Sequence, residues 1–156
     1  SLVGSEMCIR DSDNTARHLS SRYNLFIPSE NESVEGYPML KFEMILDAVG
    51  VMRAYKWVNK GQIEPDRVIK FLLNDPTMPR SLIFCYHDIV RQLTALENEY
   101  GKTYEALNIA KKIQSDLAIT LKETMVHDDI INFTSSFIFE NAQLSKLVEK
   151  EFKFNP

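Results

Sequence analysis

Residues Val68–Tyr86 read VIKFLLNDPTMPRSLIFCY, and this stretch decides how the rest of the chain can fold. An apolar helical run comes first, then a break at NDPTMP, then a second apolar helical run. Proline lacks a backbone N–H and restricts the residue before it, so Pro76 predicts that the first helix ends near Asn74 or Asp75. Proline is tolerated in the first turn of a helix, so Pro79 can begin the second helix. The stretch therefore predicts a fixed helix–corner–helix around which other helices pack.

Periodic apolar side chains predict further helices on both sides of this corner. Before it, we expect one helix over Met39–Asn59, with Gly50 at a close helix contact, and a short helix over Glu64–Asn74. After it, apolar residues spaced by four and three alternate along Leu82–Tyr100, and Gly101 ends that helix. The same reasoning gives helices over residues 13–24, 103–121 and from 127 towards 152.

The predicted fold class is all-α: an antiparallel, up-down bundle of four to five major helices plus one short helix. No stretch alternates apolar and polar residues with period two, so we expect no sheet. The predicted core comprises Phe42, Ile45, Val49, Phe71, Leu72, Tyr86, Ile89, Leu93, Ile113, Leu117, Phe133, Phe137 and Leu144.

Composition excludes several classes of protein. The chain has 156 residues, 44% of them hydrophobic, and a net charge of -4 without a basic excess, which argues against a nucleic-acid-binding surface. The longest uncharged apolar-rich run, Ile130–Phe139, is too short to span a bilayer, so we expect no membrane segment. The two cysteines, Cys8 and Cys85, form no recognisable spacing, which favours a reduced, cytoplasmic protein.

Residues that could carry chemistry are few. None of His18, His87 and His127 lies three or four residues from another histidine or a cysteine, so no metal site is expected, and no glycine loop for a cofactor phosphate occurs. Cys85 and His87 could form a nucleophile–base pair, but residues two apart on a helix point in different directions. We interpret Cys85 as a small buried side chain.

Two acid–arginine pairs are the candidate polar site. Asp75 and Arg80 flank the corner, and Asp13 and Arg17 are one helical turn apart. The simplest interpretation of each pair is a local ion pair or cap; the alternative is a site for an anion. At the start of a helix Arg80 needs an anion, because the helix dipole disfavours a cation there. We expect Asp75 to supply it, with Asp66 or a carboxylate or phosphate from a partner or substrate as the other choices.

The corner also carries a family resemblance. Residues Val68–Ser81 resemble the V-x-x-F-L-L-x-D-x-x-F-P-R-S corner in the C-terminal half of the bacterial Alpha-E family, with Met78 in place of the usual aromatic residue. His127–Phe152 is similar to the closing segment of that family, and Asp13–Arg17 resembles the tail of its second Glu-Arg motif. The Glu-Arg dipeptide itself would fall at residues 10 and 11, where this chain has arginine and aspartate.

The first residues stand apart from this resemblance. Residues Ser1–Ser12 read SLVGSEMCIRDS, which resembles a translated sequencing adapter, so we expect a non-native leader. Residues 13–156 then form a single helical domain, a C-terminal fragment of a longer Alpha-E protein. Loss of the preceding half is expected to expose apolar surface and to favour self-association.

The resemblance implies a modest function. Alpha-E genes neighbour genes for ATP-grasp-type ligases and transglutaminase-like proteins, which implies an accessory or binding module that works with such a partner in forming or modifying peptide or amide bonds. The alternative is an enzyme subunit acting on an amide or acyl phosphate through acidic and arginine residues, with its site completed by the missing N-terminal half. We favour the non-catalytic module, without cofactor, for this fragment.

Overall fold

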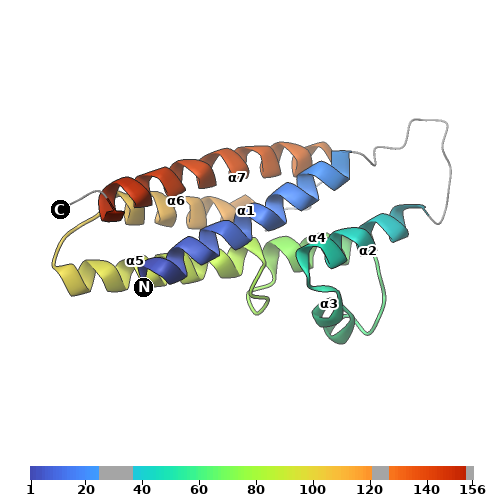
Figure 1. Cartoon of the computed structure of the whole chain (residues 1–156). Helices are drawn as coiled ribbons and strands as arrows, with labels where there is room; N and C mark the ends of the chain where they lie inside the picture. The colour runs from blue at the N-terminus through green and yellow to red at the C-terminus, as the bar shows by residue number, and fades with distance from the viewer. Residues whose placement is uncertain (25–36, 121–126, 154–156) are drawn as a thin grey trace.

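Seven α-helices make up the regular structure in a computed structural model that describes residues 1–24, 37–120 and 127–153 (Figure 1). In chain order they are α1 (Leu2–Asn24), α2 (Tyr37–Val49), α3 (Met52–Val58), α4 (Pro65–Asn74), α5 (Leu82–Tyr100), α6 (Glu105–Thr120) and α7 (His127–Val148), followed by a π-helical turn, Glu149–Lys153. No strand occurs within these ranges, which confirms the predicted all-α fold.

The long helices form an antiparallel bundle. Helix α1 packs mainly against α5 and α7, and α6 lies against the same two helices. Helices α5, α6 and α7 run in alternating directions, while α2, α3 and α4 gather at one end beside the first turns of α5 (Figure 1). None of the helices in the described ranges is both long and apolar enough to cross a membrane.

The predicted apolar stripes form the core. Every residue predicted for it is buried except Phe133, which is partly buried and packs against the others. Two aromatic contacts are edge-to-face: Tyr55 on Phe71 with ring centroids 5.3 Å apart, and Tyr86 on Phe137 at 5.6 Å. Such pairs add about 0.5–1.5 kcal/mol beyond the burial of their area.

The single helix predicted over Met39–Asn59 is wrong, because the structure divides it at Gly50. This residue has φ +82, and the N–H groups of Gly50 and Val51 both bond to the Leu46 carbonyl, at 3.0 and 2.9 Å. This is the left-handed arrangement with which glycine commonly ends a helix. Gly50 therefore ends α2, and the chain turns into the short α3. The apolar spacing continues through the break, which is why periodicity alone did not reveal it.

The first helix is longer than the sequence predicted. It begins at Leu2 rather than near Asp13, and Ile9 is buried with only 6% of its surface exposed. Residues 2–12 therefore continue the helix expected over residues 13–24, although the helical domain was expected to begin at residue 13. That they form a non-native leader stays a prediction.

The C-terminal turn is fixed to the start of α6. The Glu151 carboxylate accepts hydrogen bonds from the backbone N–H groups of Glu105 at 3.0 Å and Ala106 at 2.7 Å. The rings of Tyr104 and Phe152 lie 4.2 Å apart. A carboxylate is favoured at a helix N-terminus, where N–H groups lack intrahelical partners. These contacts join the end of the α7 segment to α6.

Replacing Gly50 tests how α2 ends. A Cβ at this position would meet the Arg80 guanidinium, whereas a Cβ at Gly61, which has a similar φ of +79, would meet nothing within 4 Å. Both Gly→Ala changes cost the backbone strain of a left-handed conformation, about 1–3 kcal/mol. We expect Gly50→Ala to lower the unfolding free energy by about 1 kcal/mol more, the worth of one disturbed hydrogen bond. Urea denaturation measures the difference; equal costs at the two positions would contradict this account.

Candidate functional site

The corner between α4 and α5 uses its own polar groups. Asp75 Oδ1 accepts hydrogen bonds from the backbone N–H of Thr77 at 2.9 Å and from its hydroxyl at 2.7 Å. The Ser81 hydroxyl donates to the Asp75 carbonyl at 2.5 Å and accepts from the Phe84 N–H at 3.2 Å, which caps α5. The helix therefore begins after Ser81, so the prediction that Pro79 opens it is wrong. The hydroxyl of Ser81 supplies the N-cap instead.

The Arg80 side chain contacts α2 rather than an acid. Its Nη1 donates a hydrogen bond to the Val49 carbonyl, and its own backbone carbonyl accepts one from the Thr15 hydroxyl of α1 at 2.9 Å. The last carbonyls of a helix have no intrahelical partner and carry partial negative charge, so a guanidinium is well placed there. Arg80 is paired, as expected, but the expected partner Asp75 is wrong, as is the alternative Asp66: within the described ranges, no ion pair or hydrogen bond joins Arg80 to either.

The second predicted pair is local. Arg17 Nε lies 2.8 Å from Asp13 Oδ2, four residues away on α1, and 60% of the Arg17 side chain is exposed. Exposed pairs at this spacing contribute about 0.3–0.5 kcal/mol. The simpler interpretation, a surface ion pair, therefore describes it. Asp75 and Arg80 lie at the corner, whereas Asp13 lines a groove between α1 and α7, so the two pairs do not share one cleft.

This groove, which we call the α1/α7 groove, is the best candidate for a site. Its volume is about 450 Å³. Residues from both helices and the turn after α7 line it: Glu6, Ile9, Arg10, Asp13, Asn141, Ala142, Ser145, Lys146, Val148 and Glu149. Acidic and basic side chains therefore line the same groove. Such a surface can bind a ligand that carries both a carboxylate and an ammonium group, or the polar backbone of a peptide.

Asn141 fixes the floor of the α1/α7 groove. It is 1% exposed, and its Nδ2 donates to the Ile9 carbonyl at 3.0 Å and to the Ser12 hydroxyl at 3.3 Å. Its Oδ1 accepts a hydrogen bond from the Tyr86 hydroxyl of α5. One amide thus joins α1, α5 and α7. A buried polar group with all its partners holds a fixed geometry, because losing any partner is costly.

Sequence reasoning missed most of this groove. Asn141 lay within the segment similar to the family, but it received no role, and Ser145, Lys146 and Glu149 were not singled out. The available signal was an amide inside the apolar stripe between Phe137 and Leu144. A buried amide on such a stripe needs partners on a neighbouring helix.

The two thiols are protonated and poorly placed for chemistry. Burial, together with its hydrogen bond to Asp88 at 3.0 Å, raises the pKa of Cys8 to about 12. Burial also raises the pKa of Cys85, as do the negative charges of Asp11 and Asp88 and that of Cys8 once it is ionised. The thiolate is the reactive form, so neither residue is an activated nucleophile.

The acid next to Cys8 is held ionised. Burial pushes the pKa of Asp88 upwards, but hydrogen bonds from Cys8, Arg91 and Gln92 outweigh that effect and place it below the usual value. The bond from Gln92 is 2.7 Å long. Within the part of the chain that the structure describes, no cluster of three or more His, Cys, Asp or Glu side chains could hold a metal ion.

Comparison with known families gives one result. The sequence model of the Alpha-E family, described as a predicted alpha-helical domain with a conserved ER motif, matches residues 9–152. The match covers most of the chain, which therefore belongs to the Alpha-E family. No curated protein and no solved structure matches it significantly.

The two positions at which the resemblance expects the family motif lie on α1. The chain has no Glu-Arg dipeptide, and the resemblance described above would put its positions at Arg10 and Asp11. Arg10 lines the α1/α7 groove, whereas Asp11 is close enough to α5 for its charge to raise the pKa of Cys85. The two motif positions therefore face different neighbours: the first the groove, the second α5.

Substituting Arg80 separates a structural role from a binding role. Arg80→Ala removes the hydrogen bond to the Val49 carbonyl, so we expect the unfolding free energy to fall by about 1–2 kcal/mol. The matched control Arg17→Ala breaks an exposed pair and should cost no more than about 0.5 kcal/mol. Chemical denaturation of both variants measures this. If the Arg80→Ala variant were as stable as the native chain, the guanidinium would have no structural role, and a role in binding a ligand would be favoured.

The raised thiol pKa values predict slow alkylation. At about pH 8, iodoacetamide should label the cysteines of the folded chain at least about a hundredfold more slowly than in denaturant. Because the pKa of folded Cys8 lies above its ordinary value of 9.0, its stabilising contribution is complete below that pH. That contribution is lost as the pH rises towards 12. Rapid labelling of the folded chain at about pH 8 would contradict the raised pKa values of these thiols.

Proposed function

We propose that this Alpha-E chain is a non-catalytic accessory module that holds a peptide-like substrate in the α1/α7 groove for an ATP-grasp-type ligase or a transglutaminase-like enzyme. The observation that carries the proposal is that acidic and basic side chains from both helices line this one groove, among them Asp13 on α1 and Lys146 on α7. An amino acid or peptide end carries both an ammonium and a carboxylate, which these side chains complement. A cytoplasmic location, where ATP is available, is part of the proposal.

Two features favour binding over catalysis. The acid and arginine of the corner already have local partners, Thr77 for Asp75 and the Val49 carbonyl for Arg80. Proton transfer also needs an acid or base with a suitably tuned pKa, and the thiols are shifted away from reactivity. The groove instead offers a fixed floor at Asn141 and charged walls, which suits recognition of a ligand.

The position of the family motif adds support. Arg10, at which the resemblance would put the first motif residue, lines the same groove as Asp13 and Lys146. A family member with glutamate at this position would present one more carboxylate to the groove and favour the ammonium group of a ligand. The module would then select its substrate by charge, while the chemical step belongs to the partner enzyme.

Charge reversal in the α1/α7 groove tests the proposal. Lys146 lines the groove, and Lys150 is an exposed lysine one turn further along that is not among its lining residues. We expect Lys146→Glu to weaken binding of the dipeptide Ala-Ala by about tenfold, as measured by NMR titration, because it repels the carboxylate. Lys150→Glu should bind as the native chain does. Unchanged dipeptide binding by the Lys146→Glu variant would overturn the assignment of the groove.

A second measurement addresses the partner. The ligase encoded beside an Alpha-E gene is purified and its amide-forming rate is measured with and without the chain. A rate increase that Lys146→Glu abolishes and Lys150→Glu retains is the expected result. Amide formation by the chain without the ligase would contradict an accessory role and favour an enzyme.

A further inference from the structure

Helix α3 presents a tryptophan to solvent. Trp57, the single tryptophan of the chain, is 87% exposed, and the neighbouring Val58 is 55% exposed. A large aromatic side chain that stays in water does not contribute the stabilising free energy that its burial would give. Tryptophan is also enriched among the residues that dominate binding at protein interfaces. Its exposure on a well-anchored helix therefore needs a reason.

Basic side chains surround this tryptophan. Arg53, Lys56 and Trp57 are spaced by three and four residues, which places them on one face of α3, and Lys60 follows directly after the helix. All three basic residues are exposed. Within the described ranges, the three ion pairs of the chain involve none of them. We call Arg53, Lys56, Trp57 and Lys60 the α3 patch.

The α3 patch is held rigidly from behind. Tyr55 points away from Trp57 and is fully buried, with its ring edge-to-face on Phe71 of α4. Its hydroxyl donates to the Gln62 carbonyl at 2.6 Å and accepts from the Glu64 N–H at 3.4 Å. Tyr55 therefore fastens the short helix to α4 and to the segment that joins α3 to α4. A surface that is ordered before binding loses less entropy when a partner docks.

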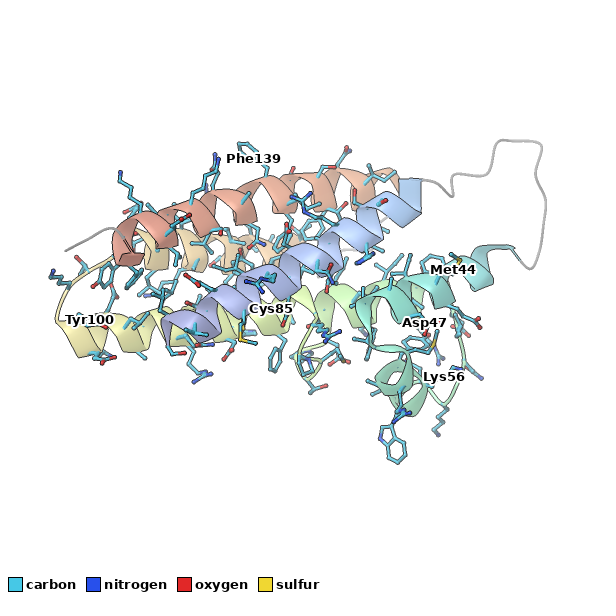
Figure 2. The ribbon with its side chains drawn as sticks, in the orientation of Figure 1. Met44, Asp47, Lys56, Cys85, Tyr100 and Phe139 are labelled. Atoms are coloured by element: carbon cyan, nitrogen blue, oxygen red, sulfur yellow. The ribbon has the colours of Figure 1, made fainter. Side chains whose placement is uncertain are left out.

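The charge of the α3 patch is opposite to that of the remaining chain. Residues 51–70 contain five lysines and arginines but two acids, while the whole chain has a net charge of -4, so the other residues carry -7 together. Figure 2 labels Lys56 on α3, which projects from the end of the bundle far from Tyr100. At physiological salt, charges act over about 8 Å, so a compact ligand on α3 feels mainly the local positive charge.

We propose that the α3 patch docks a short acidic segment of a partner protein, with an apolar residue of that segment packed on the Trp57 indole. The basic side chains complement acidic residues, and the indole gives an apolar anchor beside them. A long polyanion, such as nucleic acid or an anionic membrane, extends beyond the patch and meets the negative charge of the remaining chain. The surface is separate from the α1/α7 groove, and the inference stands whether or not that groove binds a substrate.

The single tryptophan makes the test direct, since its fluorescence reports on this surface alone. The probe is a short synthetic peptide of glutamate and aspartate residues with one central Phe-Leu pair. The control peptide replaces the acids by glutamine and asparagine. We expect a saturable blue shift of Trp57 emission with the acidic peptide, weakened by added salt, and no shift with the control peptide.

Two charge-reversal variants complete the experiment. Arg53→Glu with Lys56→Glu should weaken peptide binding by about tenfold, while Lys111→Glu with Lys112→Glu, an exposed pair on α6, should leave it unchanged. Circular dichroism confirms that both variants fold. If the first variant does not fold, the proposal is tested by two measurements on the native chain: the salt dependence of acidic-peptide binding and the absence of binding by the neutral peptide.

Several outcomes overturn the proposal. These are an unchanged Trp57 emission, an equal shift with the neutral peptide, or equal binding by the two charge-reversal variants. A blue shift that depends only on the concentration of the chain would assign the α3 patch to a second copy. A shift seen only with an oligonucleotide, or only with vesicles of anionic phospholipid, would assign it to those polyanions.

Discussion

The hydrogen bond from the Arg80 guanidinium to the Val49 carbonyl fixes where the smaller helices lie on the bundle. Arg80 is held by the corner between α4 and α5, and its own carbonyl accepts a bond from Thr15 of α1. Residues from one corner thus contact α1 and α2 as well as the two helices they join. The approach requires Gly50, because a Cβ there would meet the guanidinium. The corner between α4 and α5 therefore determines how α1 and α2 pack against it.

Local signals in the sequence were sufficient for the fold class and most of the core. The stripe along Leu82–Tyr100 and the proline at residue 65 correspond to helices α5 and α4, since helical periodicity and proline position are properties of a short segment. The break at Gly50 was missed because apolar spacing continues through it and one glycine can equally mark close packing. Its meaning depends on φ, which a sequence does not state.

The candidate site was harder to predict because its parts are distant in the chain. Asp13 and Lys146 line one groove, yet more than a hundred residues separate them. The prediction of the Arg80 partner was wrong for the same reason. The nearest acids in sequence were Asp75 and Asp66, but the Arg80 guanidinium bonds to the Val49 carbonyl at the end of α2. A pattern identifies which side chains need a partner; only the packing of helices identifies the partner.

Beneath each of the two proposed surfaces lies a buried tyrosine with hydrogen bonds to the segments that form it. Tyr86 bonds to Asn141 beneath the α1/α7 groove, and Tyr55 bonds to Gln62 and Glu64 behind the α3 patch. A buried hydroxyl must keep its hydrogen bond, and a large ring resists displacement from a packed core. Each tyrosine therefore holds the backbone and side chains beneath its surface in a fixed position relative to the core. Because the two anchors belong to different helix pairs, α5 with α7 and α3 with α4, a ligand at one surface can bind without disturbing the other.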